Sequence, residues 1–247
     1  MRAFETEKTE VAEIDRSVYD IKDKVNAAFE VNSGLTAEIV EQISKEKHDP
    51  DWMREFRLKA LDIYNKASIP NWGPSLEGLD MRNIVTYVRP NTEMRGKWSE
   101  VPDDIKNTFE RLGIPQAERS SLAGVGAQYD SEVVYHNVKE EVAAQGVVYT
   151  DMESALTGPY ADMVKEHFMK CVPPTDHKFA ALHGAVWSGG SFVYVPAGVH
   201  VDIPLQSYFR LNAPGAGQFE HTLIIVDKGA YLHFIEGCSA PKYNVAN

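Results

Sequence analysis

The sequence predicts an α+β protein with a mainly helical N-terminal part and a C-terminal part built from short strands. Of its 61 charged residues (25 basic plus 36 acidic), only seven lie in residues 192–247. Apolar residues recur at helical spacing in residues 52–67 and at alternate positions beyond residue 200. Glycine and proline turns separate these alternating runs. We therefore expect a helical region with short strands over residues 1–175 and a β-rich core over residues 176–247.

Helices are expected through most of the first 70 residues. Residues 11–21 place valine and isoleucine at spacings that share one helix face. The hydroxyl of Thr36 can cap a second helix. Asp49 followed by Pro50 is typical of a cap and a first turn, and residues 52–67 then carry apolar side chains at i, i+3, i+4 and i+7.

Shorter elements are expected in the middle of the chain. Residues 84–88 indicate a strand. A helix is expected from Pro102 to Leu112, because acidic residues occupy its first turn and Gly113 follows its end. The other elements expected before residue 170 are strands at 133–135 and 147–149 and helical turns that begin at Asp151 and Gly158.

Period-two alternation dominates the back third. Val201, Ile203 and Leu205 are expected on one strand face, as are Leu223 and Ile225 on another. The residues 231, 233 and 235 repeat the pattern. Short strands with tight turns fit a sandwich, a barrel or a β-helix, and periodicity does not choose among them.

Composition excludes some classes of protein. The formal charge of −11 argues against a nucleic-acid partner, whose phosphates need a basic face. No apolar run approaches the roughly 20 residues that span a bilayer, so no membrane insertion is expected. The polar N-terminus has no signal-peptide pattern, which predicts a cytoplasmic protein. With two cysteines, a structural disulfide is not expected there.

Two motifs carry weak chemical signals. Gly124 and Gly126 start like a dinucleotide fingerprint, but the third glycine and a preceding strand are missing, so we expect a turn. His200 follows a Pro-Ala-Gly turn that resembles the second metal motif of cupins. The companion motif is absent, because His221 and His233 are twelve residues apart. A cupin-like metal-dependent enzyme that uses His200 stays an alternative, as does a non-catalytic interaction module.

The two cysteines have different settings. Cys171 ends a helical segment before two prolines, and we expect it to pack in the core. Cys238 lies where an apolar strand gives way to a turn, with Glu236 on the same side of an extended chain. A cation such as Arg210 can lie on an adjacent strand. A thiolate at a strand end near charged groups is suited to accept sulfur or to ligate iron.

Several segments resemble iron–sulfur cluster assembly scaffolds of the SufB/SufD family. The resemblance is dense from about residue 50 to Lys242. It is carried by the sequences WMREFRLKAL at 52–61, WGP at 72–74, LGIP at 112–115, LAGVGAQY at 122–129, SEVVY at 131–135, KFAAL at 178–182, FVYVP at 192–196, YFR at 208–210 and EGCSAP at 236–241.

The resemblance implies a fold and an assembly. Residues 176–247 would form a partial β-helix core, the first coils of a right-handed parallel β-helix after the helical region. The family continues beyond Asn247, so the chain is expected to stop about three coils into the β-helix. In the family, C-terminal helices dock a SufC-type ABC ATPase, and SufB pairs with a SufD-type or a second SufB-type subunit.

The resemblance also implies a function and a site. The chain would be an assembly scaffold, itself not an enzyme, that receives sulfur from a cysteine desulfurase or its sulfur carrier. Cys238 falls on the sulfur acceptor, and Arg210 and Asn212 fall on residues of the sulfur route. Cys238 and Glu236 are the candidate ligands for iron. The cluster would be transient, and a reduced flavin is expected only in the full complex.

Overall fold

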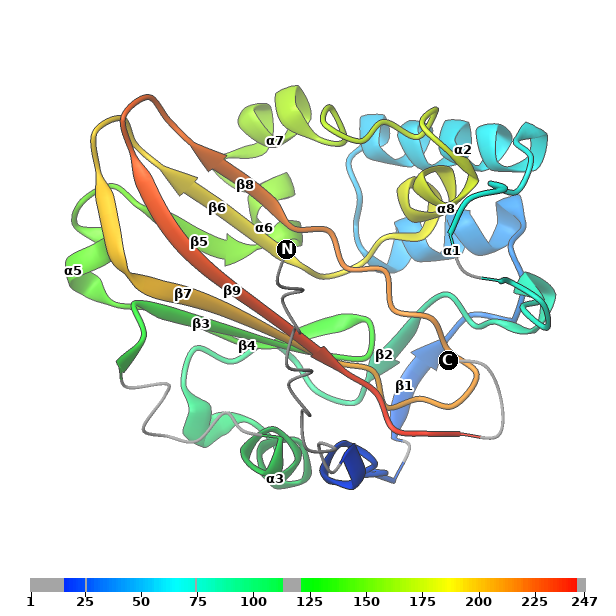
Figure 1. The fold of residues 1–247 in the computed structure, drawn as a ribbon, viewed down its shortest axis with the longest axis horizontal. Helices are drawn as coiled ribbons and strands as arrows, with labels where there is room; N and C mark the ends of the chain where they lie inside the picture. Colours follow the sequence, from blue (N-terminus) through cyan, green and yellow to red (C-terminus); the bar gives the residue numbers. More distant parts are fainter. Residues whose placement is uncertain (1–15, 25, 74, 113–120, 244–247) are drawn as a thin grey trace, which may run out of the picture.

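The computed structural model describes residues 16–24, 26–73, 75–112 and 121–243. It has the expected α+β composition. Figure 1 shows the longer helices gathered at one end of the molecule and the longer strands at the other. The N-terminal helix expected over residues 11–21 lies partly outside the described residues; within them, Arg16–Tyr19 form one 3-10 turn.

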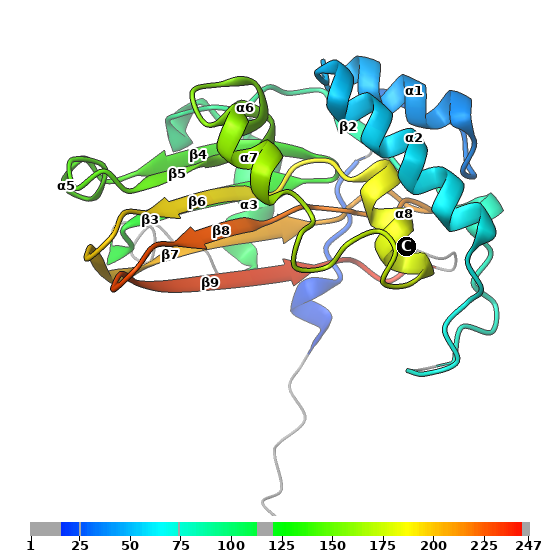
Figure 2. The ribbon, with the colours of Figure 1, turned by 90° about the horizontal axis from the view of Figure 1, so that it is seen from above.

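Three helices pack together at the helical end. These are α1 (Ala37–Glu46), α2 (Asp51–Lys66) and α8 (Lys178–Val186). The hydroxyl of Thr36 accepts from the Ile39 backbone N–H at 3.4 Å and caps α1 as expected. Gly184 allows α8 to approach α2, because a Cβ there would lie 3.1 Å from the Cβ of Ala60. Figure 2 shows the three helices side by side.

Some of the expected helix boundaries and caps are wrong. Pro50 is the N-cap residue of α2, and the carboxylate of Asp49 instead accepts from buried Arg57. Ala27–Glu30 form a strand, β1, within a region expected to be helical. α8 occupies the start of the region expected to be strands, because its alanine-rich sequence favours a helix and Ala181, Ala185 and neighbouring side chains pack into the helical core.

The remaining helices are short. Asp151 caps α6 as expected, because its carboxylate accepts from the Ser154 backbone N–H at 2.8 Å. The helix expected from Pro102 to Leu112 is α3, but its stop at Gly113 lies outside the described residues. The bounds are Asp103–Arg111 for α3, Glu140–Ala143 for α5, Met152–Thr157 for α6 and Ala161–His167 for α7, with 3-10 turns at Met81–Asn83 and Trp98–Glu100.

The strands of the described residues form three sheets. A small sheet pairs β1 with β2 (Val88–Pro90). The strand expected at 84–88 is therefore displaced, since Val85 makes only an isolated bridge. The larger sheets have the orders β4-β3-β7-β9 and β5-β6-β8. Their strands are β3 (Gly124–Tyr129), β4 (Glu132–Val138), β5 (Val148–Asp151), β6 (Ser191–Val195), β7 (His200–Arg210), β8 (Leu223–Val226) and β9 (Tyr231–Ser239).

Two glycines in β3 allow the side chain of Tyr149 from the opposite sheet to approach this strand closely. Gly124 and Gly126 lie in this buried strand, so the turn expected there is wrong. A Cβ on Gly126 would lie 2.8 Å from the hydroxyl of Tyr149, which reaches across from β5. The two glycines serve a close approach between sheets and not a nucleotide-binding turn.

The last four strands repeat in space. β6 and β7 run parallel to β8 and β9, and the pairs Phe192–Leu223 and His200–Tyr231 give an offset of 31 residues in both sheets. The offset falls to 29 at Leu205–Phe234, because β7 has extra residues in a bulge. That bulge leaves Ile203 45% exposed, although Val201 and Leu205 are buried as expected.

Both larger sheets are open. β8 and β9 are edge strands on the same side of the molecule, as Figure 2 shows, and no barrel closes within the described residues. Ile224 and Val226 of β8 are about 40% exposed there (39% and 43%). None of the helices in the described ranges is long and apolar enough to cross a membrane.

Candidate functional site

Cys238 and Glu236 point to the same side, into the space between the two larger sheets. Glu236 pairs in register with Ser207, and Cys238 with Phe209. Parallel partners in register place their side chains on the same face of a sheet. Ser207 faces inward, because its hydroxyl lies 2.8 Å from the Tyr149 hydroxyl of the opposite sheet. The thiol therefore belongs to the inward row.

The thiol is nevertheless exposed, because β9 is the last strand of its sheet. Cys238 lines a cavity of about 760 Å³ at the end of β9, together with residues 17–20. Glu236 is also exposed and accepts a hydrogen bond of 2.7 Å from the Thr222 hydroxyl. This setting makes the sulfur accessible to a partner, as a sulfur acceptor must be.

Arg210 lies on the opposite face of the sheet from the thiol. Its register partner is Ser239, one residue beyond Cys238, and its Nη1 lies 3.2 Å from the Ser239 hydroxyl. The guanidinium is fully buried and donates to the carbonyl oxygens of Tyr19, at 3.0 Å, and Ile21. Burial lowers the pKa of Arg210. Within the described residues no hydrogen bond joins this cation to Cys238.

Asn212 also contacts the N-terminal segment. Its Oδ1 accepts from the Asp23 backbone N–H at 3.0 Å, and its Nδ2 donates to the Asp23 carbonyl at 3.4 Å. Its own backbone N–H donates to Asp130, at 2.6 Å. Burial raises the pKa of Asp130 to about 6. The two residues expected on the sulfur route are thus brought together by residues 19–23 and not by the thiol.

The described residues do not form a complete metal site. In the described part of the chain, no three His, Cys, Asp or Glu side chains converge on one point. Cys238 and Glu236 supply two donors, fewer than a closed iron or zinc site needs. His200 is exposed at the start of β7, with its Nε2 3.2 Å from the Gly229 carbonyl. Together with the open sheets, this leaves the cupin alternative without a favourable observation.

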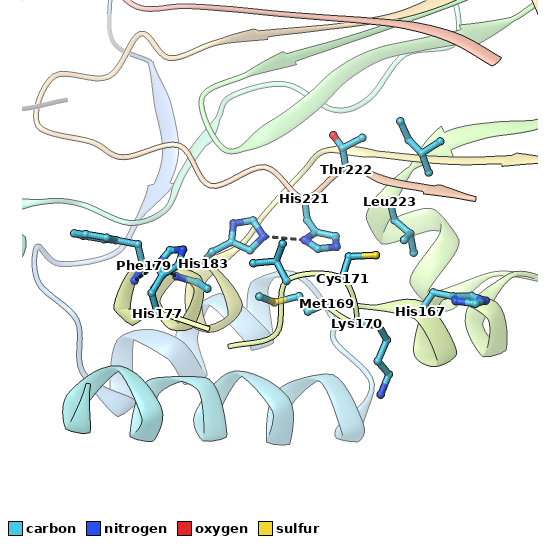
Figure 3. A pocket seen from close by; sticks show the side chains of 13 residues that line it. His167, Met169, Lys170, Cys171, His177, Phe179, His183, His221, Thr222 and Leu223 are labelled. Atoms are coloured by element: carbon cyan, nitrogen blue, oxygen red, sulfur yellow. Dashed lines mark hydrogen bonds between the residues drawn. The ribbon is translucent and has the colours of Figure 1, made fainter. Parts of the chain in front are cut away.

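A second cavity, of about 420 Å³, was missed by the sequence reasoning. Figure 3 shows His183 of α8 hydrogen-bonded to His221. The two ring nitrogens lie 2.8 Å apart. Cys171 lines this cavity and is exposed, so its expected burial is wrong. The pair was not predictable, because 38 residues separate the two histidines and the packing of α8 brings them together.

The histidine pair predicts acid sensitivity. Burial lowers the pKa of His183 to about 4 and that of His221 to about 3. The unfolded chain binds these protons from pH 6.5 downward, so stability falls as the pH drops below that value. Between pH 7 and pH 5, the free energy of unfolding should fall by about 1–2 kcal/mol less in His221→Gln than in the parent, measured by urea unfolding. His200→Gln, at an exposed histidine, is the control; an equal acid loss in His221→Gln and the parent would contradict the prediction.

Comparison with known proteins shows which family the chain is similar to. The family model described as the SufBD protein N-terminal region matches residues 37–207. The chain is 54% identical over 225 residues to the iron–sulfur cluster assembly protein SufB of Bacillus subtilis, covering 91% of this chain and 48% of that protein.

Two further relatives carry a similar description. An iron–sulfur cluster assembly SufBD family protein of Staphylococcus haemolyticus is 49% identical over 93% of the chain and 49% of its own length. One of Mycobacterium bovis is 49% identical over 94% of the chain and 28% of its own length. The chain thus spans about half the length of the first two relatives and less of the third.

Proposed function

The chain belongs to the SufBD family of iron–sulfur cluster assembly proteins, and from this membership we propose that it accepts sulfur at Cys238 for cluster assembly. The observation that carries the proposal is the position of the thiol. Cys238 is exposed on an edge strand, lines a cavity and shares its inward row with Glu236. A structural cysteine would instead be buried in the core.

The proposed chemistry is a persulfide exchange. The Cys238 thiolate attacks the outer sulfur of a donor persulfide, and the donor's S–S bond breaks. The donor leaves as a thiolate, and Cys238 becomes a persulfide, so no external oxidant or reductant is needed. Iron is cargo in this scheme. Glu236 offers a carboxylate oxygen beside the sulfur, and the remaining ligands would come from outside the described residues.

The stacking of β6 and β7 on β8 and β9 supports a β-helix. We propose that these strands are coils of a right-handed parallel β-helix, with the exposed edges of β8 and β9 paired to a further strand. That strand can come from more of the same polypeptide or from another subunit. The SufC-type ATPase, the SufD-type or second SufB-type subunit and the reduced flavin stay expectations about the whole assembly.

Sulfur loading tests the proposed function. After incubation with a cysteine desulfurase and L-cysteine, we expect cyanide-labile sulfur on the parent chain and nearly none on Cys238→Ala. Cys171→Ala is the matched control, because Cys171 is the second exposed thiol of the chain. It should load like the parent. Equal loading of Cys238→Ala and the parent would remove Cys238 from the mechanism.

A further inference from the structure

Residues 17–23 form a strap that crosses the outer face of the sheet beside the end of β9. Two side chains of β7 and the loop after it fasten the strap from below. Arg210 donates to the carbonyl oxygens of Tyr19 and Ile21, and the Asn212 amide bonds to both backbone polar atoms of Asp23. Both fasteners are buried, at 0% and 1% exposure.

The carboxylate of Asp23 anchors the strap a second time. It accepts from the Thr108 hydroxyl of α3 at 2.6 Å and from the Tyr129 hydroxyl of β3 at 2.7 Å. Burial and the nearby Asp23 carboxylate raise the pKa of Tyr129, so the phenol stays a donor at neutral pH. Hydrogen bonds to a charged acceptor are among the stronger ones in proteins. Asp23 therefore ties the strap to two separate elements.

The strap also joins the chain just after Cys238. The Lys242 backbone N–H donates to Asp20 at 2.7 Å, and the ammonium of Lys22 lies 5.3 Å from the centre of the Tyr243 ring. The cavity that Cys238 lines is bounded on its other side by Ser17, Tyr19 and Asp20. One wall of the cavity is thus the strap itself.

We infer that Arg210, Asn212 and Asp23 are positioning residues that act on Cys238 through this strap. The inference rests on the proposed sulfur acceptance at Cys238 and gives Arg210 and Asn212 a role other than contact with the sulfur. They hold one wall of the cavity that Cys238 lines at the free edge of β9, and this cavity is the route we infer for a donor persulfide. Asp23 joins this set, although its side chain faces α3 and β3.

Unfastening the strap tests the inference. In a Cys171→Ser background, Asp23→Ala should speed hydrogen exchange in residues 19–23 by roughly tenfold or more, since two charge-assisted hydrogen bonds are lost. Its Cys238 should react several-fold faster with the anionic disulfide 5,5′-dithiobis(2-nitrobenzoate), because the wall no longer confines the approach. Asp23→Asn keeps one carbonyl acceptor, so its exchange rate and thiol reaction rate should lie between those of the parent and Asp23→Ala.

The control is Asp62→Ala, which removes an exposed carboxylate of α2 that pairs only with Lys66 among the described residues. Faster exchange without faster thiol reaction would overturn the inference, because the strap would not limit access. Unchanged exchange would overturn it as well, because Asp23 would not fasten the strap. Failure of the proposed function would give a different result: the parent chain would take no sulfur from the desulfurase, although its thiol still reacts with the disulfide.

A comparison of two variants separates the strap from direct contact. Arg210→Gln and Asp23→Ala should both lower the desulfurase concentration needed for half-maximal loading, because the strap no longer limits access to Cys238, and both should keep the maximal loading. If the guanidinium acted on the sulfur itself, Arg210→Gln would lower the maximal loading and Asp23→Ala would load like the parent. That pattern would refute the strap's role.

Discussion

Lys47→Met is expected to lower the free energy of unfolding by about 3 kcal/mol at pH 7. The ammonium of Lys47 lies 2.8 Å from carboxylate oxygens of both Glu132 and Glu153, and its side chain is only 5% exposed. Methionine fills a similar volume without charge. It would leave two largely buried carboxylates facing each other without a cation, and the cost of an uncompensated buried charge dominates.

The same cluster holds neighbouring elements together. Glu153 of α6 also accepts from the Gly189 backbone N–H at 2.6 Å, and Glu132 of β4 accepts from the Tyr87 hydroxyl. Lys47 follows the end of α1, so the cluster links the helical end of the molecule to the sheets. Loss of the cation weakens this link as well as the ion pair.

The pH dependence of the variant follows from the pKa values. Burial alone would lower the pKa of Lys47, but Glu153 and Glu132 outweigh it and raise that pKa. Burial alone would raise the pKa of Glu153, but Lys47 holds it below its ordinary value. The cluster therefore stabilises the parent fully between the ordinary values of about 4.5 and 10.5, and its contribution is lost outside that range.

In Lys47→Met the direction of the pKa shift of Glu153 reverses. Without the cation, burial raises the pKa of Glu153, so protonation as the pH falls relieves the buried charge. The deficit relative to the parent should shrink between pH 8 and pH 5, measured by urea unfolding of both proteins. Lys66→Met is the control, because its pair with Asp62 is exposed and worth about 0.5 kcal/mol. A deficit that stays constant or grows as the pH falls would contradict this account.

Much of the fold was predictable where a local pattern decides it. The amphipathic α2, the cap at Thr36 and the cap at Asp151 follow from neighbouring residues alone. The alternation of apolar residues after residue 200, together with the low number of charges there, predicted the strands. By contrast, β1 depends on its pairing with β2, and the helix preference of α8 was masked by the strand pattern that follows it.

The candidate site was predictable in identity but not in arrangement. The sequence pointed to Cys238, Glu236, Arg210 and Asn212, and alternation placed Glu236 on the side of the thiol. The face of Arg210 relative to the thiol depends on the odd offset between β7 and β9, 29 residues at the pair Arg210–Ser239, and this tertiary register is not visible in the local pattern. The contacts of the strap join residues about 190 positions apart, beyond any local pattern.

Arg57→Met is expected to have the largest effect, a loss of about 3–5 kcal/mol in the free energy of unfolding. Both Arg57 and its partner Asp49 have fully buried side chains, and the Nε of Arg57 donates to Asp49 at 2.6 Å. Nη1 donates to the Trp187 carbonyl at 2.8 Å, and the guanidinium carbon lies 4.7 Å from the centre of the Trp187 ring. Circular dichroism during urea unfolding would measure the loss.

A matched pair of variants separates the buried charge from the lost packing. Arg54→Met removes an arginine one turn earlier on α2 whose pair with Glu41 is exposed, and it should cost far less than Arg57→Met. Adding Asp49→Asn to Arg57→Met removes the stranded carboxylate and should recover part of the loss, because a neutral amide costs less to bury than an unpaired charge. If the double variant were no more stable than Arg57→Met, the loss would come from the lost contacts of Arg57 with Trp187 and not from the stranded Asp49 carboxylate.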